Sequence, residues 1–156
     1  MKKEVRLYNV LFPIWLFWLW PSLAWLIILP ANFVLDSLVL CLSMKWNGVG
    51  NKFQIWKQSI AKIWVVGFVS DLIGAALAFG LMVLIDAVGL PWDTIHFPGT
   101  MLLSVPGVML AGVLIYHCNK RFSFVHCELD AEQIRKLCLT LAVFTAPYAM
   151  LIPLYG

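Results

Sequence analysis

Two aspartates, Asp36 and Asp71, lie inside long apolar runs of the sequence. A charge at the centre of a membrane helix costs at least about 2.5–3.5 kcal/mol on insertion scales, so such residues normally face protein or a water-filled cavity and often mark ion or proton paths. Asp36 precedes Lys45 by nine residues, and Asp71 follows Lys62 by nine. With both lysines at one membrane interface, the two carboxylates would lie at a similar depth, roughly 13 Å in.

The residues around these aspartates favour burial between helices. Asn32 lies one helical turn before Asp36. Small residues, which let neighbouring helices approach closely, recur at four-residue spacing around the second aspartate, at Ser70, Gly74 and Ala78. Two carboxylates in a low-dielectric site cannot easily both ionise. We therefore expect Asp36 and Asp71, with Asn32, to meet in the bundle or across a subunit interface and to share a proton or a cation. The structural alternative is a protonated Asp that only holds helices together through a hydrogen bond.

Other chemistry has little support in the sequence. There is no Walker loop, HExxH, nucleophile elbow or G-x-G-x-x-G, so we do not expect an enzyme or a cofactor. Two His-Cys pairs, His117-Cys118 and His126-Cys127, offer ligand types that suit zinc or copper. Adjacent residues rarely both reach one ion, and the usual short spacing between ligands is missing. We expect these four side chains to lie at a membrane interface and to bind no metal.

The composition requires lipid around much of the surface. Of the 156 residues, 62% are hydrophobic and 12% are charged, whereas a soluble domain has about 45–50% apolar and about 25% charged residues. The net charge of +3 is modest, and we expect no nucleic-acid partner. The fold class predicted for residues 1–156 is therefore a single all-α, polytopic transmembrane helical bundle.

The positive charges predict the topology. All 11 Lys and Arg residues fall in three patches: Lys2, Lys3 and Arg6; Lys45, Lys52, Lys57 and Lys62; Lys120, Arg121, Arg135 and Lys136. Lys and Arg favour cytoplasmic loops, which places loops 45–62 and 117–136 inside and the loop 86–99, without Lys or Arg, outside. The apolar runs between them are Leu7–Met44, Ile63–Ile85, Thr100–Tyr116 and Leu137–Tyr155. Five crossings satisfy this pattern, with the N-terminus cytoplasmic and the C-terminus extracytoplasmic.

The first hairpin allows more than one arrangement. A crossing needs about 20 residues, and Leu7–Met44 supplies 38 for two. A turn at Trp20-Pro21-Ser22 leaves a short first arm and a second arm kinked at Pro30. A turn at Pro30-Ala31-Asn32 leaves a short second arm instead. Four crossings with a re-entrant N-terminal segment are the alternative.

Both cytoplasmic loops contain a segment with the pattern of an interfacial helix. In Asn51–Lys62, apolar residues recur at helical spacing and two lysines can meet anionic headgroups. In Glu128–Lys136, Asp130 and Gln133 form the pattern of a capping box, and Glu132 and Lys136 are spaced for an ion pair. We expect both helices to run directly into membrane helices.

Two functions from different classes follow. The first is a small transporter or channel, cation- or proton-coupled through Asp36 and Asp71, in a bacterial cytoplasmic membrane. We expect it to be a homo-oligomer, because five helices enclose little space. The second is a non-transporting scaffold or accessory subunit that binds a partner membrane protein through its small-residue faces. The sequence indicates no particular transported substrate.

The topology predicts opposite accessibility for two engineered cysteines. Asp93→Cys, in the predicted outer loop, should react with a membrane-impermeant thiol reagent added to intact cells. Lys57→Cys should react only after the cells are opened. The reverse pattern would overturn the orientation.

Overall fold

The structure is a computed structural model that describes residues 25–91 and 98–151. Of these residues 84% are helical and none is in a strand. The prediction of an all-α fold is therefore confirmed for this part of the chain. The elements are the α-helices α2 (Trp25–Trp46), α3 (Lys52–Val88), α4 (Gly99–Cys118) and α5 (Ala131–Phe144), the π-helix η1 (Asn119–Ser123) and the 3-10 helix η2 (Tyr148–Leu151).

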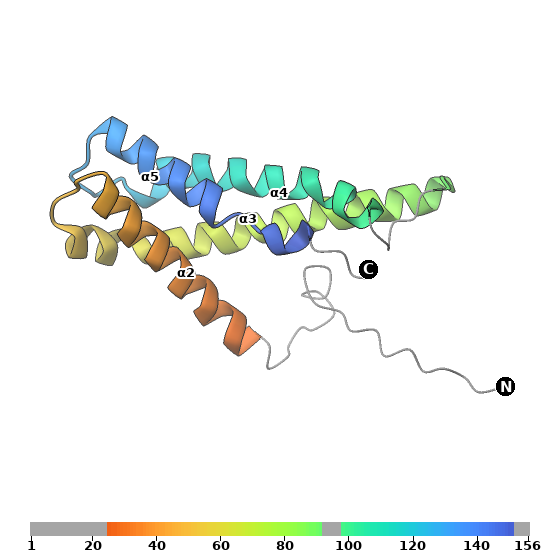
Figure 1. Cartoon of the computed structure of the whole chain (residues 1–156), viewed down its shortest axis with the longest axis horizontal. Helices are drawn as coiled ribbons and strands as arrows, with labels where there is room; N and C mark the ends of the chain where they lie inside the picture. The colour runs from red at the N-terminus through yellow and green to blue at the C-terminus, as the bar shows by residue number, and fades with distance from the viewer. Residues whose placement is uncertain (1–24, 92–97, 152–156) are drawn as a thin grey trace.

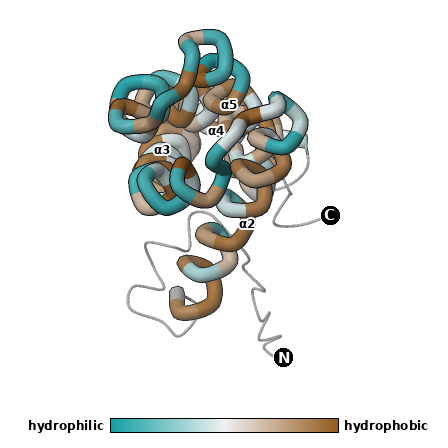
Figure 2. Tube along the Cα trace, turned by 90° about the vertical axis from the view of Figure 1, so that its left-hand side faces the viewer, coloured by the Kyte–Doolittle hydropathy of each residue, from teal (hydrophilic) through white to brown (hydrophobic). Residues whose placement is uncertain are grey.

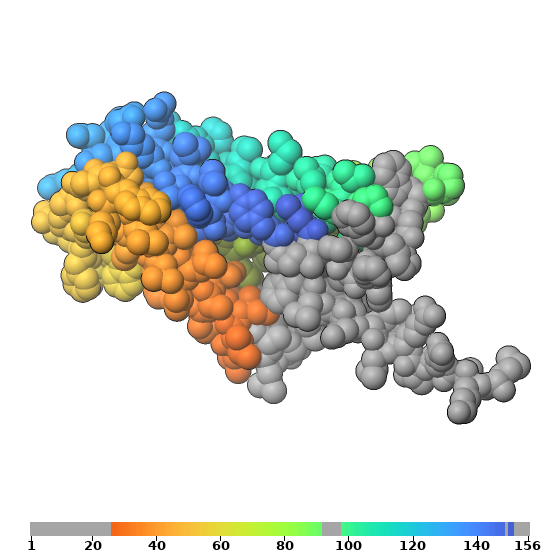
Figure 3. Space-filling model, viewed as in Figure 1, coloured from red at the N-terminus to blue at the C-terminus, as the bar shows by residue number. Residues whose placement is uncertain are grey.

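The long helices α3 and α4 run antiparallel and form the body of the molecule (Figure 1). The C-terminal part of α2 packs on α3, whereas its N-terminal part leans away from the pair (Figure 1). Helix α5 lies against α4 and against α2, and the space-filling view shows its side chains beside those of α2 (Figure 3). The connections 47–51 and 119–130 lie at the same end of the bundle, where hydrophilic residues gather (Figure 2). Two of the three predicted positive patches therefore lie at one end.

Three helices are long and apolar enough to cross a membrane. They are Leu26–Trp46, Lys52–Val88 and the continuous stretch Gly99–Ser123. Large apolar side chains on them face outward, and those of Ile27 and Met109 are 73% and 66% exposed. Such a surface is compatible with an integral membrane protein, because lipid rather than water would cover it. Helix α3 has 37 residues, roughly 55 Å at 1.5 Å per residue, and so exceeds an apolar core of about 30 Å.

The helix bounds correct parts of the predicted topology. Helix α2 continues through Pro30, so the turn predicted at Pro30-Ala31-Asn32 is wrong. The other arm of that hairpin lies outside the described residues. The described part of the predicted crossing Leu137–Tyr155 is not one continuous helix, because α5 ends at Phe144 after 14 residues. Pro147 explains this end, since proline has no N–H to donate and its ring disfavours a helix before it. Five crossings are therefore not confirmed.

The predicted interfacial segments are helical. The first is not a separate element, because residues from Lys52 onward form the beginning of α3 without a break. The second interfacial segment forms the beginning of α5. Gln133 Oε1 accepts a hydrogen bond from the Asp130 backbone N–H at 3.2 Å, which is part of the predicted capping box. The predicted pair Glu132–Lys136 is present at 3.5 Å on the exposed face.

The closest helix contact joins α3 and α4 at two glycines. A Cβ atom built on Gly74 would lie 2.5 Å from the carbonyl oxygen of Gly107, and one built on Gly107 would overlap the carbonyl oxygen of Gly74. Ala111 and Ala78 flank the contact: their Cβ atoms lie 3.1 and 3.3 Å from where a Cβ on Gly74 and on Gly107, respectively, would be. The two backbones therefore touch directly, an approach that only small residues permit.

Substitution of Gly74 should separate the two helices. Gly74→Ala places a methyl group against backbone and should lower the free energy of unfolding by about 1–3 kcal/mol, the usual cost of overpacking. Gly80→Ala on the same helix is the matched control, because a Cβ there meets open space. Unfolding of the purified protein in detergent measures both. Equal stability of the two variants would contradict the close contact.

Candidate functional site

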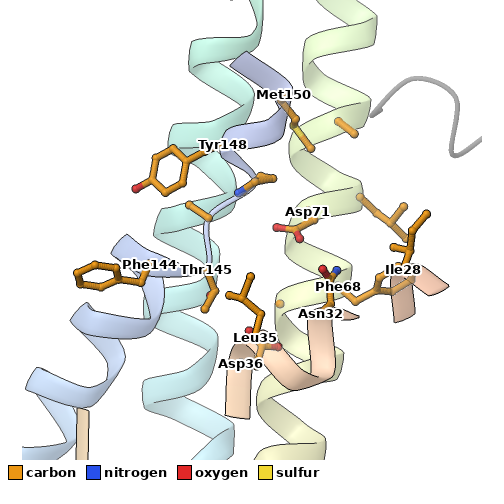
Figure 4. Close-up of a pocket in the computed structure, with 15 residues that line it drawn as sticks. Ile28, Asn32, Leu35, Asp36, Phe68, Asp71, Phe144, Thr145, Tyr148 and Met150 are labelled. Carbon is orange, nitrogen blue, oxygen red and sulfur yellow. The ribbon is translucent and has the colours of Figure 1, made fainter. Parts of the chain in front are cut away.

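A cavity of about 330 Å³ lies between α2, α3 and the segment that follows α5 (Figure 4). Helix α2 contributes Asn32 and Asp36, α3 contributes Asp71, and the segment from Phe144 to Met150 forms the third wall. The structure thus brings the three predicted site residues to one cavity.

Asp36 is nearly enclosed, with 5% of its surface exposed. Its Oδ2 atom packs over Gly67 of α3: a Cβ atom built on Gly67 would lie 3.5 Å from Asp36 Oδ2. Asp71 lies four residues beyond Gly67, about 6 Å further along the helix. The Asp36 carboxyl group is therefore level with a residue one helical turn before Asp71 on α3. The cause is the register of α2 on α3, which the spacing from the lysines does not contain.

Neither carboxyl group is neutralised by a residue of the cavity. Asp71 Oδ1 is buried and has no hydrogen-bond partner among the described residues. No described residue forms a hydrogen bond or an ion pair with Asp36 either. The described lining contains no Lys, Arg or His. Two acids thus face one space without a compensating cation, and a cation or shared protons would supply the missing partner.

The interruption after α5 adds negative potential at the same place. Thr145 donates two hydrogen bonds to the carbonyl oxygen of Leu141, one from its N–H and one from its hydroxyl, each 2.8 Å long. The Tyr148 hydroxyl donates to the carbonyl oxygen of Val143. These bonds close the end of α5 beside the cavity, and the last turn contains no basic residue. The C-terminal end of a helix carries a partial negative charge, so it also favours a cation. This wall was not predicted from the sequence, although Thr145-Ala146-Pro147 is a pattern typical of a helix end.

Aromatic contacts tie α2 to α3 at the edge of the cavity. The Trp64 indole N–H donates a 3.2 Å hydrogen bond to the carbonyl oxygen of Leu29, one residue before Pro30. Phe33 lies edge-on between Trp56 and Trp64, with ring centroids 6.4 and 6.2 Å away. These contacts hold α2 where Asp36, three residues after Phe33, reaches Gly67.

The small residues predicted near Asp71 lie outside the cavity lining. Gly74 and Ala78 belong to the α3–α4 contact. Ser70 is buried, and its hydroxyl donates a 2.7 Å hydrogen bond to the Val66 carbonyl oxygen of its own helix. The stripe therefore positions α3 against α4, while the neighbouring face of α3 presents Gly67 and Asp71 to α2.

The two His-Cys pairs lie at the hydrophilic end of the bundle. His117 is exposed at the end of α4 and contacts the ring of Tyr116. Cys127 Sγ lies 3.8 Å from Gln58 Oε1; burial raises the pKa of this thiol, and the nearby Lys62 ammonium group lowers it in part. Within residues 25–91 and 98–151, no three or more His, Cys, Asp or Glu side chains are grouped to hold a metal ion. That His117, Cys118, His126 and Cys127 bind no metal stays a prediction.

Comparison with known proteins does not assign this site. No protein-family model, curated protein or solved structure matches the chain.

Substitutions of Gly67 test whether Asp36 packs against it. Gly67→Ala should change the free energy of unfolding by no more than about 1 kcal/mol, because its methyl group makes an ordinary contact and alanine favours helices. Gly67→Leu must displace the Asp36 side chain and should cost about 1–3 kcal/mol. Chemical unfolding in detergent compares the two. If leucine is tolerated as well as alanine, the described packing of Asp36 is wrong.

Proposed function

We propose that this protein is a small integral membrane transporter in which Asp36 and Asp71 couple movement to a cation or to protons. The observation that carries the proposal is the shared cavity, in which two carboxyl groups lack any cationic partner among the described residues. Intramembrane carboxylates are costly and often mark proton and ion paths. An interrupted helix beside such a site is also a recurrent feature of transporters.

The proposed coupling follows from charge balance. With a cation between them, both carboxylates can be ionised, because the cation offsets their repulsion. When the cation leaves, one or both groups take up a proton, because two uncompensated charges are unfavourable in a low-dielectric site. A cation and protons would therefore compete for one site. Exchange follows if the cavity opens alternately to the two sides of the membrane, and the divergence of α2 from the α3–α4 pair (Figure 1) supports α2 as the moving element.

Two observations favour transport over a purely structural or scaffolding function. An Asp that only holds helices together needs a hydrogen-bond partner, and Asp71 Oδ1 has none among the described residues. A scaffold that uses the predicted small-residue face needs that face free, whereas Gly74 and Ala78 are in contact with α4. A scaffold would thus have to use other surfaces.

We also propose the orientation and the remaining topology. Connections 47–51 and 119–130 and their flanking lysines and arginines lie at one end of the bundle (Figure 2). This supports a cytoplasmic location for that end, near anionic headgroups. We further propose that the chain crosses a bacterial cytoplasmic membrane five times. We also propose that it assembles as a homo-oligomer or with a partner membrane protein.

Flux in proteoliposomes tests the function. Wild-type protein should dissipate an imposed proton, Na⁺ or K⁺ gradient, and Asp36→Asn or Asp71→Asn should reduce that flux at least about tenfold, since asparagine keeps the shape but not the charge. Asp86→Asn is the matched control, because Asp86 is exposed on the same helix and outside the cavity. Ion-sensitive dyes inside the liposomes report the rates.

The controls separate the explanations. Circular dichroism and gel filtration must show that the variants fold. Absence of flux for all three ions with folded wild-type protein would contradict ion-coupled transport and favour the scaffold. Full flux in both cavity variants would remove the carboxylates from the mechanism.

A further inference from the structure

The cavity walls divide into a small acidic part and a large apolar part. Beyond Asn32, Asp36 and Asp71, the lining is mostly aliphatic and aromatic: Leu35, Phe68, Leu72, Phe144, Tyr148 and Met150 are among its members. Figure 4 shows Asp71 directed into the space between α3 and the segment around Thr145. A ligand that fills this space therefore meets charge at one part of its surface and apolar groups over the rest.

A divalent metal ion such as Ca²⁺ or Mg²⁺ does not match such a lining. Ca²⁺ takes about 6–8 oxygen ligands and Mg²⁺ a near-octahedral set. The described polar side chains of the cavity are Asn32, Asp36, Asp71, Thr145 and Tyr148, and the last two already donate their hydroxyls to carbonyl oxygens of α5. The remaining wall offers few oxygen ligands. The space of about 330 Å³ also lies within the range of pockets that hold small organic molecules.

We propose that the cavity binds an amphiphilic organic cation, an ammonium group carried on an aromatic or aliphatic body. The ammonium group lies between Asp36, which is 95% buried and has no partner among the described residues, and Asp71. The apolar body lies against Phe68, Leu72 and Met150. Aromatic rings in the lining add cation–π attraction, and the negative end of α5 adds to the field. This inference names the substrate class of the proposed transport site and rests on it.

Equilibrium binding tests the inference separately from transport. The full chain in lipid nanodiscs is titrated with benzyltrimethylammonium chloride by calorimetry. Tetramethylammonium, which has the charge without the apolar body, and benzyl alcohol, which has the ring without the charge, are the matched ligands. Benzyltrimethylammonium should bind saturably and at least about tenfold more tightly than either, a difference of about 1.4 kcal/mol.

Variants separate the two parts of the site. Asp36→Asn and Asp71→Asn should each weaken benzyltrimethylammonium binding at least about tenfold, because a buried opposite charge is lost, while Asp86→Asn leaves it unchanged. Leu72→Ala should weaken benzyltrimethylammonium binding more than tetramethylammonium binding, because it removes only apolar contact. Leu84→Ala is its control, since Leu84 is exposed on the same helix outside the cavity.

Each outcome decides between the proposals. No saturable binding to folded wild-type protein, binding that survives both Asp→Asn changes, or equal affinity for the three ligands overturns the inference. Asp-dependent flux of protons, Na⁺ or K⁺ without benzyltrimethylammonium binding also overturns it, while the proposed transport function stands. Asp-dependent binding with no flux of any of these ions or of the organic cation supports the inference and removes the transport function.

Discussion

The direct backbone contact between Gly74 and Gly107 is the constraint on which the rest of the structure depends. It brings α3 and α4 closer than any side chain would permit, and the resulting pair is the support for every other element. Ala75 and Val108, one residue beyond each glycine, form with Met150 the small buried cluster on which η2 rests. The position of the segment after α5, and with it one wall of the cavity, therefore follows from how closely the two long helices pack.

The cavity results from three local irregularities around this regular pair. Helix α2 is held by Trp64 and Phe33 and diverges beyond them. Gly67 lets the Asp36 carboxyl group lie against the backbone of α3. Helix α5 stops before Pro147, so the following segment crosses the end of the space instead of filling it. Together they leave the cavity that Asn32, Asp36 and Asp71 line.

The electrostatics of the cavity is unusual for a site that only stabilises a fold. Buried charges in proteins are normally paired, and in a membrane the alternative partner, water, is scarce. Here two carboxyl groups and the negative end of a helix face one space, and no basic side chain of the described lining offsets them. Such an arrangement is favourable only when protons or a cation occupy it. The proposed exchange of protons for a cation at this site follows from that charge balance.

The sequence by itself determined the class of fold and the candidate residues. Its low charge content and apolar runs predict long apolar helices that are compatible with membrane spans. The polar capping pattern at Asp130 predicts the start of α5, and the cost of burying Asp36 and Asp71 singles them out. Only the tertiary structure decided which faces meet. The register of α2 on α3, which places Asp36 at Gly67 and one turn from Asp71, depends on the packing of Phe33 and Trp64. The third wall depends on where α5 ends and where η2 rests on the α3–α4 pair. Hydrophobicity and charge are properties of each residue, so their pattern can be predicted from the sequence alone. Helix register and cavity shape depend on contacts between residues that are distant in sequence, so they require the tertiary structure.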